Sequence, residues 1–344
     1  MKIVCVCDYF VDKELQEKYK ELEQYGAEVD IVENPDLVDS KDACMEIMFQ
    51  TEKKGAESVA CNPQVINAMK NADIAIVHIT PVNKAVIDQC PNLKMLGVMR
   101  GGVDSVNVEY LKEKGVTVVN APTRSAHAVA DFTVGMILSE VNNIAKSYHG
   151  IMEGHWIKEY ANNDNVHDLR TRKVGIVGCG NIGREVIKRL QAFGCDIIVY
   201  DPFIDGNAIE AMGYHAVTKD ELLEESDIIS MHLRLSDETR GFFGEKEFKK
   251  MKKDCVLINT ARAGLVDQEA MLEALREKRI SGAAVDVFEE EPLPVENEYI
   301  KLDNITMTSH IAGTSCDTFQ NSVDLIFEEA KRYLQGEKPI CVVK

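Results

Sequence analysis

Three polar side chains in the C-terminal third of the chain have the types and positions needed for acid–base chemistry on a carboxylate-bearing molecule. Arg262 follows a predicted strand at Cys255–Asn259, and an arginine at the carboxyl end of a parallel strand points into the crevice where ligands bind. Its planar fork of N–H donors suits a carboxylate or an α-keto acid. His310 follows another predicted strand, at Ile305–Thr308, and Glu291 lies in an acidic turn before it.

Each of these residues also has a simpler interpretation when it is considered alone. A single arginine is as often a surface charge as a ligand, the run Glu289–Glu291 is typical of a solvated turn, and a lone histidine is more often structural than catalytic. A carboxylate beside a histidine, however, orients the ring and suits a group that exchanges protons near neutral pH. The assignment therefore depends on the elements that position these residues.

A glycine-rich turn between two predicted strands is the best-defined element of the chain. A β-branched strand at Lys173–Val177 leads directly into the pattern GCGNIG, and a second strand follows at Asp196–Tyr200. Gly178 permits a tight turn, Gly180 lets the backbone approach a pyrophosphate, and Gly183 allows close packing of helix on strand. Strand, glycine turn, helix and strand in this order are typical of a dinucleotide-binding unit.

The residues that flank the glycines indicate which dinucleotide is bound. Asn181 is well placed to begin the helix, whose free N–H groups attract phosphates, and Ile182 starts its apolar face. Asp201 lies at the end of the second strand, where a carboxylate can hold a ribose diol. Because a 2′-phosphate would meet like charge there, the sequence predicts NAD rather than NADP.

Composition restricts the class of protein. A chain of 344 residues is too long for one compact core and long enough for two domains. The formal net charge of −18, without a basic block, argues against nucleic acid or an anionic membrane as a partner.

No apolar run reaches the roughly 18–20 residues that span a bilayer, and the start MKIVCVCDYF lacks the features of a signal peptide. Ten cysteines without CxxC and eight histidines without HExxH predict no structural metal and no disulfide framework, as expected of a reduced cytoplasmic protein.

The alternation of predicted strands and helices indicates two α/β domains. The strands predicted in residues 1–121 are Ile3–Cys7, Glu28–Val32, Ile74–His78, Met95–Val98 and Val116–Val119, while residues 34–62 are interpreted as a helix and a loop. After Pro122, an apolar-periodic run predicts one long helix over Ser125–Tyr148. Further strands are predicted at Tyr214–Val217, Ile228–Met231, Cys255–Asn259, Gly282–Val287 and Ile305–Thr308. A final helix over Thr314–Gln335 precedes Ile340–Val343, which can add one strand to the first domain.

Four motifs in this order resemble those of the D-isomer-specific 2-hydroxyacid dehydrogenases over nearly the whole chain. They are the glycine turn GCGNIG and the segments NTARAG, DVFEEE and SHIAG. The resemblance implies two doubly wound parallel-sheet α/β domains, of Rossmann or flavodoxin type, with a cleft between them. Residues 1–121 with 314–344 would form the catalytic, substrate-binding domain, and 122–313 the NAD-binding domain. The family's usual homodimer, formed through the nucleotide domain, is expected too.

The resemblance also implies roles for individual residues. Arg262 would bind the substrate carboxylate and polarise its carbonyl group, and His310 would donate or accept the proton with Glu291 as its partner. Glutamine replaces this acid in formate dehydrogenases, so that activity is not expected. Asp286 would hold the nicotinamide carboxamide. The other positions expected to contact ligands are Thr260, Ala261 and Gly313 for the cofactor, and Gly101 and Gly102 for the substrate carboxylate. Ser309 and Asp131 stand where the family usually has proline and glutamate.

Additional arginines bear on the choice of substrate. Arg100 precedes the Gly101–Gly102 pair, Arg124 follows Pro122, and Arg234 stands where many relatives have proline. They are either scattered surface charges or a site for a second anionic or polyhydroxylated end of the substrate. The second interpretation favours a phosphorylated or sugar-derived acid such as 3-phosphoglycerate. A rival for the whole chain is an NAD-sensing regulatory or scaffold protein with the same fold, which the lack of low-complexity tails disfavours.

Overall fold

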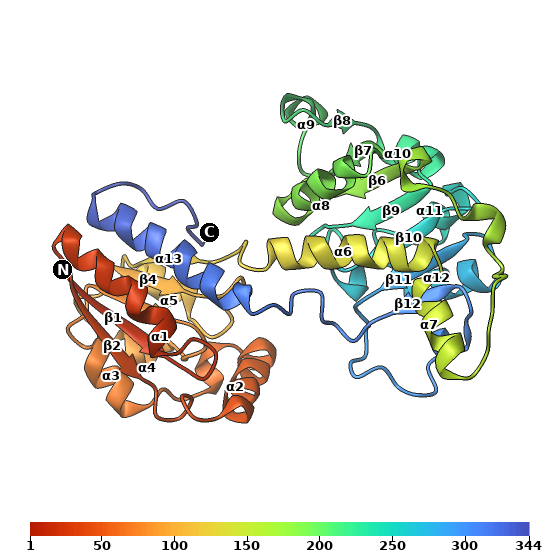
Figure 1. Ribbon diagram of the computed structural model, residues 1–344. Helices are drawn as coiled ribbons and strands as arrows, with labels where there is room; N and C mark the ends of the chain where they lie inside the picture. Colours follow the sequence, from red (N-terminus) through yellow and green to blue (C-terminus); the bar gives the residue numbers. More distant parts are fainter. Residues whose placement is uncertain (344) are drawn as a thin grey trace. The chain divides into compact units, whose positions relative to one another are not determined.

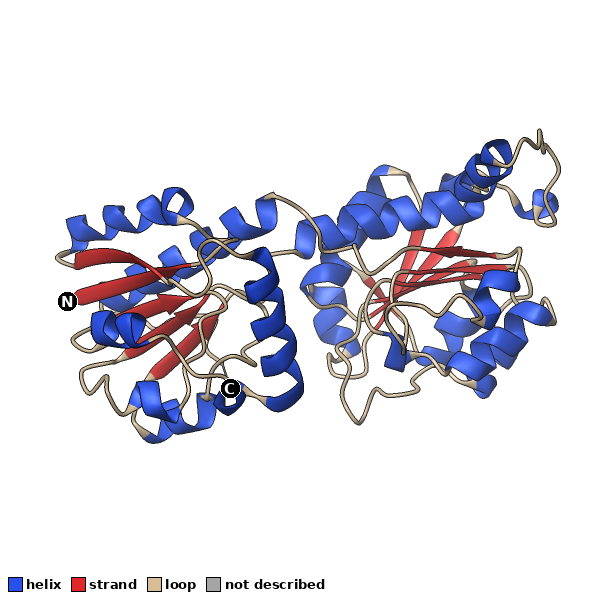
Figure 2. Cartoon of the chain, turned by 90° about the horizontal axis from the view of Figure 1, so that it is seen from below, coloured by secondary structure: helices blue, strands red, loops and turns tan. Residues whose placement is uncertain are grey.

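The computed structural model describes residues 1–343, which form two α/β units that are each built on one parallel sheet (Figure 1). Unit 1 comprises Met1–Ser125 and the C-terminal segment from Ser315, and unit 2 comprises Ala126–Thr314. In each unit, helices lie on both sides of the strands (Figure 2). The predicted fold class of two doubly wound parallel-sheet domains is therefore confirmed.

The sheet of unit 1 has five parallel strands in the order β2-β1-β3-β4-β5. These strands are β1 (Lys2–Cys7), β2 (Glu28–Glu33), β3 (Ile74–Val77), β4 (Met95–Val98) and β5 (Thr117–Asn120). Every residue of β3 and β4 is buried, because helices cover both faces of the sheet. All five strands lie within one residue of their predicted limits.

The helices of unit 1 come from both ends of its sequence. They are α1 (Lys13–Gln16), α2 (Lys41–Lys54), α3 (Pro63–Met69), α4 (Lys84–Ile87), α5 (Val108–Glu113) and α13 (Asp317–Leu334), with 3-10 turns at Glu17–Tyr25 and Ala56–Ser58. Gly97 lets α13 pack closely on β4, because a Cβ there would lie 2.7 Å from Ile326 Cγ2. The predicted last strand is reduced to one antiparallel bridge between Val342 and Val119.

The sheet of unit 2 has seven parallel strands in the order β12-β11-β10-β9-β6-β7-β8. They are β6 (Lys173–Val177), β7 (Asp196–Tyr200), β8 (His215–Ala216), β9 (Ile228–Met231), β10 (Val256–Asn259), β11 (Gly282–Val285) and β12 (Ile305–Met307). The order of the strands reverses beside β6. In open α/β sheets, ligands bind outside the carboxyl ends of the strands at such a switch point.

Unit 2 has a break in its first long helical segment that was not predicted. Its helices are α6 (Ala126–Val141), α7 (Ile144–Met152), α8 (Asn181–Ala192), α9 (Gly206–Ala211), α10 (Lys219–Glu225), α11 (Glu245–Lys250) and α12 (Gln268–Arg276), with 3-10 turns at Asn163–Asn165, Leu169–Thr171, Ala263–Leu265 and Glu298–Lys301. The single helix predicted over Ser125–Tyr148 is wrong, because Asn143 adopts φ 58° between α6 and α7. Asparagine tolerates this left-handed conformation, which no helix can continue through.

Within residues 1–343, no helix is long and apolar enough to cross a membrane. The same residues contain no group of three or more His, Cys, Asp or Glu side chains placed to hold a metal ion.

Candidate functional site

Two glycines of the turn between β6 and α8 are required by the fold itself. Gly178 has φ 103°, and a Cβ on it would lie 2.8 Å from the backbone carbon of His232. A Cβ on Gly183 would overlap the carbonyl oxygen of Gly178. The tight turn and the close packing of α8 therefore exclude any larger residue at either position.

The third glycine of the turn is not explained by the fold. Gly180 has φ −72° and ψ −165°, a conformation that any residue adopts, and a Cβ there would meet no protein atom within 4 Å. Directly after it, Asn181 begins the twelve-residue helix α8, whose first N–H groups have no partner within the helix. An open approach to a helix N-terminus fits the pyrophosphate of a dinucleotide.

Asp201 joins the end of β7 to the glycine turn. Its Oδ2 accepts a hydrogen bond from the Cys179 amide at 2.7 Å, and its Oδ1 accepts from the amides of Phe203 and Ile204 at 2.8 and 3.2 Å. A carboxylate oxygen has two lone pairs, so Oδ2 retains one acceptor position for a ribose hydroxyl. The aspartate thus has a structural role that the sequence pattern did not indicate.

Arg184 is a second supporting residue that sequence reasoning missed. Its guanidinium donates to the Cys179 carbonyl oxygen at 3.1 Å and to Asn181 Oδ1 at 2.7 Å. This side chain therefore braces the glycine turn from α8 and adds a positive charge beside it. Its position directly after Gly183 was the only available signal.

His310 and Glu291 are in direct contact. His310 Nδ1 lies 2.8 Å from Glu291 Oε2, and the other carboxylate oxygen accepts from the Phe288 amide at 2.9 Å. Burial raises the pKa of Glu291, but the Phe288 amide, His310 and the charge of Arg262 together outweigh burial and hold the pKa below its usual value. An ionised carboxylate only accepts hydrogen bonds, so Nδ1 carries the proton and Nε2 is left for another partner. His310 has φ 55°, a conformation that is rare for a residue with a side chain.

Asp286 fixes the loop that carries His310. This fully buried side chain accepts hydrogen bonds from the Thr308 hydroxyl at 2.6 Å and from the amides of Ile311 and Ala312 at 3.0 and 2.9 Å. Donors from both sides of His310 thus converge on one carboxylate, which holds the loop in its left-handed turn. Gly313 follows Ala312 at the end of this loop. A contact of Asp286 with the nicotinamide stays a prediction.

The turn after β10 presents Arg262 at the surface of unit 2. The buried Asn259 side chain donates to the Arg262 carbonyl oxygen at 3.0 Å and accepts from the Ala261 amide at 3.1 Å. The Thr260 hydroxyl lies 2.7 Å from that of Thr133 on α6. Among residues 1–343, Arg262 itself donates only to the neighbouring Ala261 carbonyl oxygen at 2.6 Å. Sequence reasoning missed Asn259 and Thr133, which hold this turn in place.

The predicted substrate residues of unit 1 also lie together. Arg100 pairs with Glu52 at 3.1 Å, and Arg124 donates to Nε2 of His78 at 3.2 Å. The exposed pair Gly101 and Gly102 directly follows Arg100, and the Gly101 carbonyl oxygen accepts from the Asn120 side chain at 2.6 Å. His78 was not among the predicted site residues, although it stands at the end of a predicted strand.

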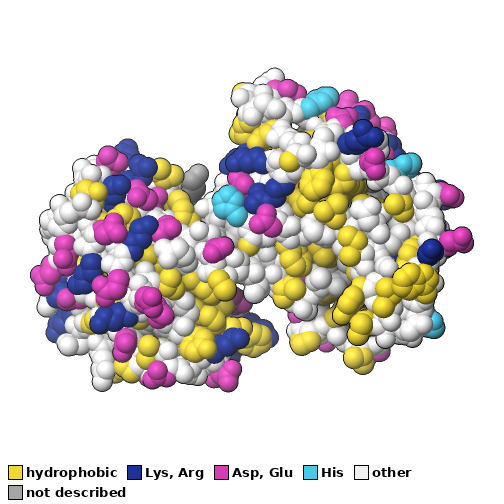
Figure 3. Space-filling view, in the orientation of Figure 1, with side chains coloured by type: hydrophobic (Ala, Val, Ile, Leu, Met, Phe, Trp, Pro, Cys, Tyr) yellow, Lys and Arg dark blue, Asp and Glu magenta, His cyan; other side chains and the backbone are white. Residues whose placement is uncertain are grey.

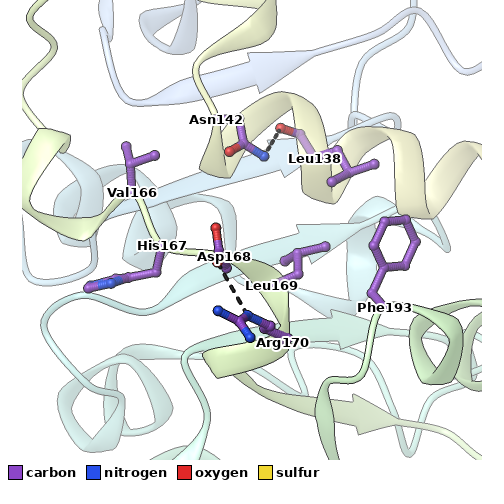
Figure 4. A pocket seen from close by; sticks show the side chains of 8 residues that line it. All are labelled: Leu138, Asn142, Val166, His167, Asp168, Leu169, Arg170 and Phe193. Carbon is purple, nitrogen blue, oxygen red and sulfur yellow. Dashed lines mark hydrogen bonds and ion pairs between the residues drawn. The ribbon is translucent and has the colours of Figure 1, made fainter.

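Unit 2 also contains a cavity that none of the residues described above lines (Figure 4). The cavity is formed by the C-terminal end of α6, the segment before β6 and the residue that follows α8. Its lining residues are Leu138, Asn142, Val166, His167, Asp168, Leu169, Arg170 and Phe193. Two of these lining residues, Asp168 and Arg170, form an exposed ion pair at 3.3 Å. None of its lining residues was predicted to bind a ligand.

Comparison with known proteins identifies the family of the chain. Residues 134–312 match the family model of the D-isomer specific 2-hydroxyacid dehydrogenase, NAD binding domain. The chain is 37% identical over 276 residues to a D-3-phosphoglycerate dehydrogenase of Methanocaldococcus jannaschii. The aligned region covers 80% of this chain and 52% of that protein. It is 33% identical over 320 residues to a glyoxylate reductase of Thermofilum pendens, which covers 91% and 92% of the two chains. It spans about half the length of the phosphoglycerate dehydrogenases that it matches.

A solved structure shares the fold. The NAD complexed form of a D-isomer specific 2-hydroxyacid dehydrogenase from Lactobacillus delbrueckii ssp. bulgaricus matches over the whole of both chains, with a TM-score of 0.77 and 22% sequence identity. At that identity the match concerns the fold alone. The family model and the relatives above show that the chain belongs to the D-isomer specific 2-hydroxyacid dehydrogenase family, with its NAD-binding domain at residues 134–312.

Proposed function

We propose that the protein is an NAD-dependent dehydrogenase that interconverts a D-2-hydroxy acid and its 2-keto acid. The observation that carries this proposal is the His310–Glu291 contact of 2.8 Å on a loop fixed by the buried Asp286. NAD supplies the hydride acceptor or donor for this chemistry. The open approach at Gly180 and the free N–H groups of α8 would receive its pyrophosphate, and Asp201 its ribose.

The chain's own residues divide the remaining work. Arg262 has no carboxylate within ion-pair distance among residues 1–343, so its guanidinium is available to bind the substrate carboxylate and to polarise the carbonyl group. His310, with Nδ1 held by Glu291, offers Nε2 to the hydroxyl group at carbon 2 and takes or gives its proton. The amides of Gly101 and Gly102 in unit 1 stay predicted donors to a substrate carboxylate.

A turnover assay tests this assignment. NADH oxidation would be followed by the loss of NADH absorbance. The substrates would be glyoxylate and 3-phosphohydroxypyruvate, the keto acids that correspond to the two relatives named above, and the unphosphorylated hydroxypyruvate. We expect turnover of at least one keto acid, and we expect Arg262→Ala and His310→Ala to abolish it without loss of NADH binding. NADH binding without turnover of any 2-keto acid would instead support an NAD-sensing protein. A phosphorylated or sugar-derived acid such as 3-phosphoglycerate is our proposed substrate class.

We also propose that the active protein is a homodimer formed through unit 2. Large apolar side chains on α7 and the segment after it are exposed, and Figure 3 displays hydrophobic side chains gathered on this unit. They are Ile144, Tyr148, Ile151, Met152, Trp156 and Ile157. Contiguous exposed apolar side chains mark interaction surfaces. Sedimentation of wild type at twice the chain mass, and of Ile151→Asp at the single mass, would support this; a monomeric wild type would refute it.

The cysteines support a cytoplasmic location for this proposed enzyme. All ten are free thiols, and most are buried. Thiols that persist without disulfides are typical of a reducing compartment.

A further inference from the structure

Unit 1 contains a buried chain of hydrogen bonds that the proposed function leaves unassigned. Asp8 directly follows β1 and is fully buried, and its Oδ2 lies 3.0 Å from Nδ1 of His78. His78 directly follows β3 and is 2% exposed, and its Nε2 lies 3.2 Å from a terminal nitrogen of Arg124. The second acceptor of that nitrogen is the Met99 carbonyl oxygen at 3.0 Å. Three polar side chains from separate parts of the sequence thus form one network.

The network lies where the strand order of unit 1 reverses. In the order β2-β1-β3-β4-β5, the reversal falls between β1 and β3, and Asp8 and His78 occupy the carboxyl ends of these two strands. Ligands of open parallel sheets bind at such a switch point. Arg100 and Gly101 follow the next strand, β4, so the predicted substrate loop leaves the same edge of the sheet.

The protonation states along the network follow from its surroundings. Burial lowers the pKa of His78, and the charges of Arg124 and Arg100 lower it further, against the opposite effect of Asp8. The neutral imidazole therefore donates through Nδ1 to Asp8 and accepts through Nε2 from Arg124. Phe10 and Phe319 flank the ring, with centroids 6.3 and 5.8 Å away. Asp8 also accepts hydrogen bonds from the amides of Phe10 and Val11, at 2.9 and 3.0 Å, so the orientation of its side chain is fixed.

Arg124 is a partly buried cation whose acceptors are both neutral. Within residues 1–343 it forms no ion pair. Burial and the nearby charge of Arg100 lower its pKa to about 10, against the opposite effect of the Asp8 carboxylate. Its Nε and second terminal nitrogen make no hydrogen bond to the described residues. Buried charges in proteins are normally paired, because an unpaired charge in a low-dielectric site is costly. The Asp8 carboxylate is not a direct partner of this guanidinium, so the N–H groups that have no acceptor among residues 1–343 are available to an anion.

Arg100 provides a second guanidinium beside the first. Its side chain is 10% exposed, its Nε is buried without an acceptor, and its carboxylate partner Glu52 is 51% exposed. Glu52 lies in the last turn of α2, where a solvated side chain can be displaced by a competing anion. Arg100 and Arg124 could then both donate hydrogen bonds to a single anion through their guanidinium groups.

We propose that Arg124 and Arg100 form a subsite for a second anionic group of the 2-hydroxy acid, either a carboxylate or a phosphate ester, and that His78 and Asp8 position Arg124. This inference rests on the proposed function and narrows it. A planar guanidinium pairs with both anions through parallel N–H···O bonds, so the shared chemistry is a distal anionic group with at least two oxygen acceptors. His78 is a positioning residue, because it acts through the guanidinium that it orients.

Calorimetry on the full chain with saturating NADH, which cannot oxidise a hydroxy acid, tests the subsite. Three D-2-hydroxy acids differ at the distal end: D-glycerate with a neutral hydroxyl, D-malate with a carboxylate, and 3-phospho-D-glycerate with a phosphate. We expect D-malate or 3-phospho-D-glycerate to bind at least tenfold more tightly than D-glycerate, and the stronger of the two identifies the anion. Arg124→Leu and Arg100→Leu should each weaken the anionic ligand about 10- to 100-fold and D-glycerate less than about twofold.

Matched variants separate positioning from folding. Arg170→Leu, which removes an exposed arginine of unit 2, should leave all three affinities unchanged. Arg124→Lys should recover only part of the affinity, because a point charge lacks the fork. His78→Asn, with wild-type thermal stability, should raise KM for the anionic keto acid while kcat for glyoxylate stays unchanged. Equal losses for D-glycerate and the anionic ligands in the arginine variants would overturn the proposal and leave the network a role in the fold.

Inorganic phosphate and malonate test the subsite without any reaction. Binding of either anion to the wild type, lost in Arg124→Leu, supports the subsite even if no keto acid is turned over, and that combination would refute only the proposed dehydrogenase activity. If neither anion binds and D-glycerate binds as tightly as the two anionic acids, the subsite does not exist, whatever the turnover.

Discussion

Replacement of Gly180 by alanine separates what the fold requires from what the cofactor requires. The three glycines of the turn differ in their surroundings, because a methyl group on Gly178 or Gly183 would meet backbone atoms, whereas one on Gly180 would meet none within 4 Å. The backbone angles of Gly180 are also accessible to alanine. We therefore expect Gly180→Ala to fold normally and to lose affinity for NADH.

The expected magnitudes follow from the position of Gly180 as N-cap of α8. Alanine is a poorer N-cap than glycine, which destabilises the folded state by roughly 0.5–1 kcal/mol. Alanine also lowers the conformational entropy of the unfolded chain, which stabilises the folded state by roughly 0.4–1 kcal/mol. Because the two effects oppose each other, the free energy of unfolding should change by less than about 0.5 kcal/mol. A methyl group between the helix N-terminus and a phosphate should remove about one charge-assisted hydrogen bond, roughly 1.5–3 kcal/mol, which is about 10- to 150-fold in Kd for NADH.

Fluorescence titration with NADH and urea denaturation measure these two quantities on the same preparations. Gly135→Ala is the control, since Gly135 lies within α6 and a Cβ there would also meet no atom within 4 Å. It should stabilise the helix by about 0.5–1 kcal/mol and leave the Kd for NADH unchanged. Unchanged NADH affinity in Gly180→Ala would refute the assignment of this turn as the pyrophosphate site. Unfolding of the variant would refute the argument from its surroundings.

Three further predictions concern single side chains. Asp201→Ala should narrow the preference for NADH over NADPH, measured as the ratio of the two kcat/KM values; equal values in the wild type would contradict the role of this carboxylate. Glu291→Gln should move the acid limb of the pH–rate profile to lower pH, because the imidazolium loses a negative partner, and an unmoved profile would show that the His310 contact does not affect catalysis. Burial lowers the pKa of His232 to about 3, so the unfolded chain binds a proton first as pH falls below about 6.5. The stability that the neutral His232 contributes is therefore fully present above that pH. Below it, the free energy of unfolding falls by up to about 1.4 kcal/mol per pH unit. Urea denaturation of His232→Gln between pH 5 and 7 should give a smaller slope than the wild type.

The sheets of both units could be predicted from the sequence because their strands are encoded locally. Parallel strands with both faces covered are short apolar, β-branched runs, and helices separate them, so β1 to β5 could be located to within one residue. The break between α6 and α7 could not be predicted in this way. The apolar period continues across it, and only the left-handed backbone of Asn143 ends the first helix.

The candidate site also contains residues that could be predicted from local sequence and residues that could not. Arg262, Glu291 and His310 belong to segments of distinctive sequence, and the contact between the last two is present as the sequence suggested. The residues that hold them in place were missed. Asn259 and Thr133 act through single hydrogen bonds to backbone or hydroxyl partners that are distant in sequence or unremarkable in type. Such contacts leave no periodic pattern for sequence reasoning to detect.

Asp8 and His78 show why the network of unit 1 was missed and how it could have been found. The two residues are seventy positions apart, and each follows an apolar strand, so each alone has the pattern of an ordinary loop start. Only the strand order, in which β3 is hydrogen-bonded to β1, brings the two ends together. The rule that assigned Arg262, a polar side chain at the carboxyl end of a parallel strand, applies equally to Asp8 and His78. Its application to unit 1 requires the pairing of the strands, and that pairing is a property of the folded sheet.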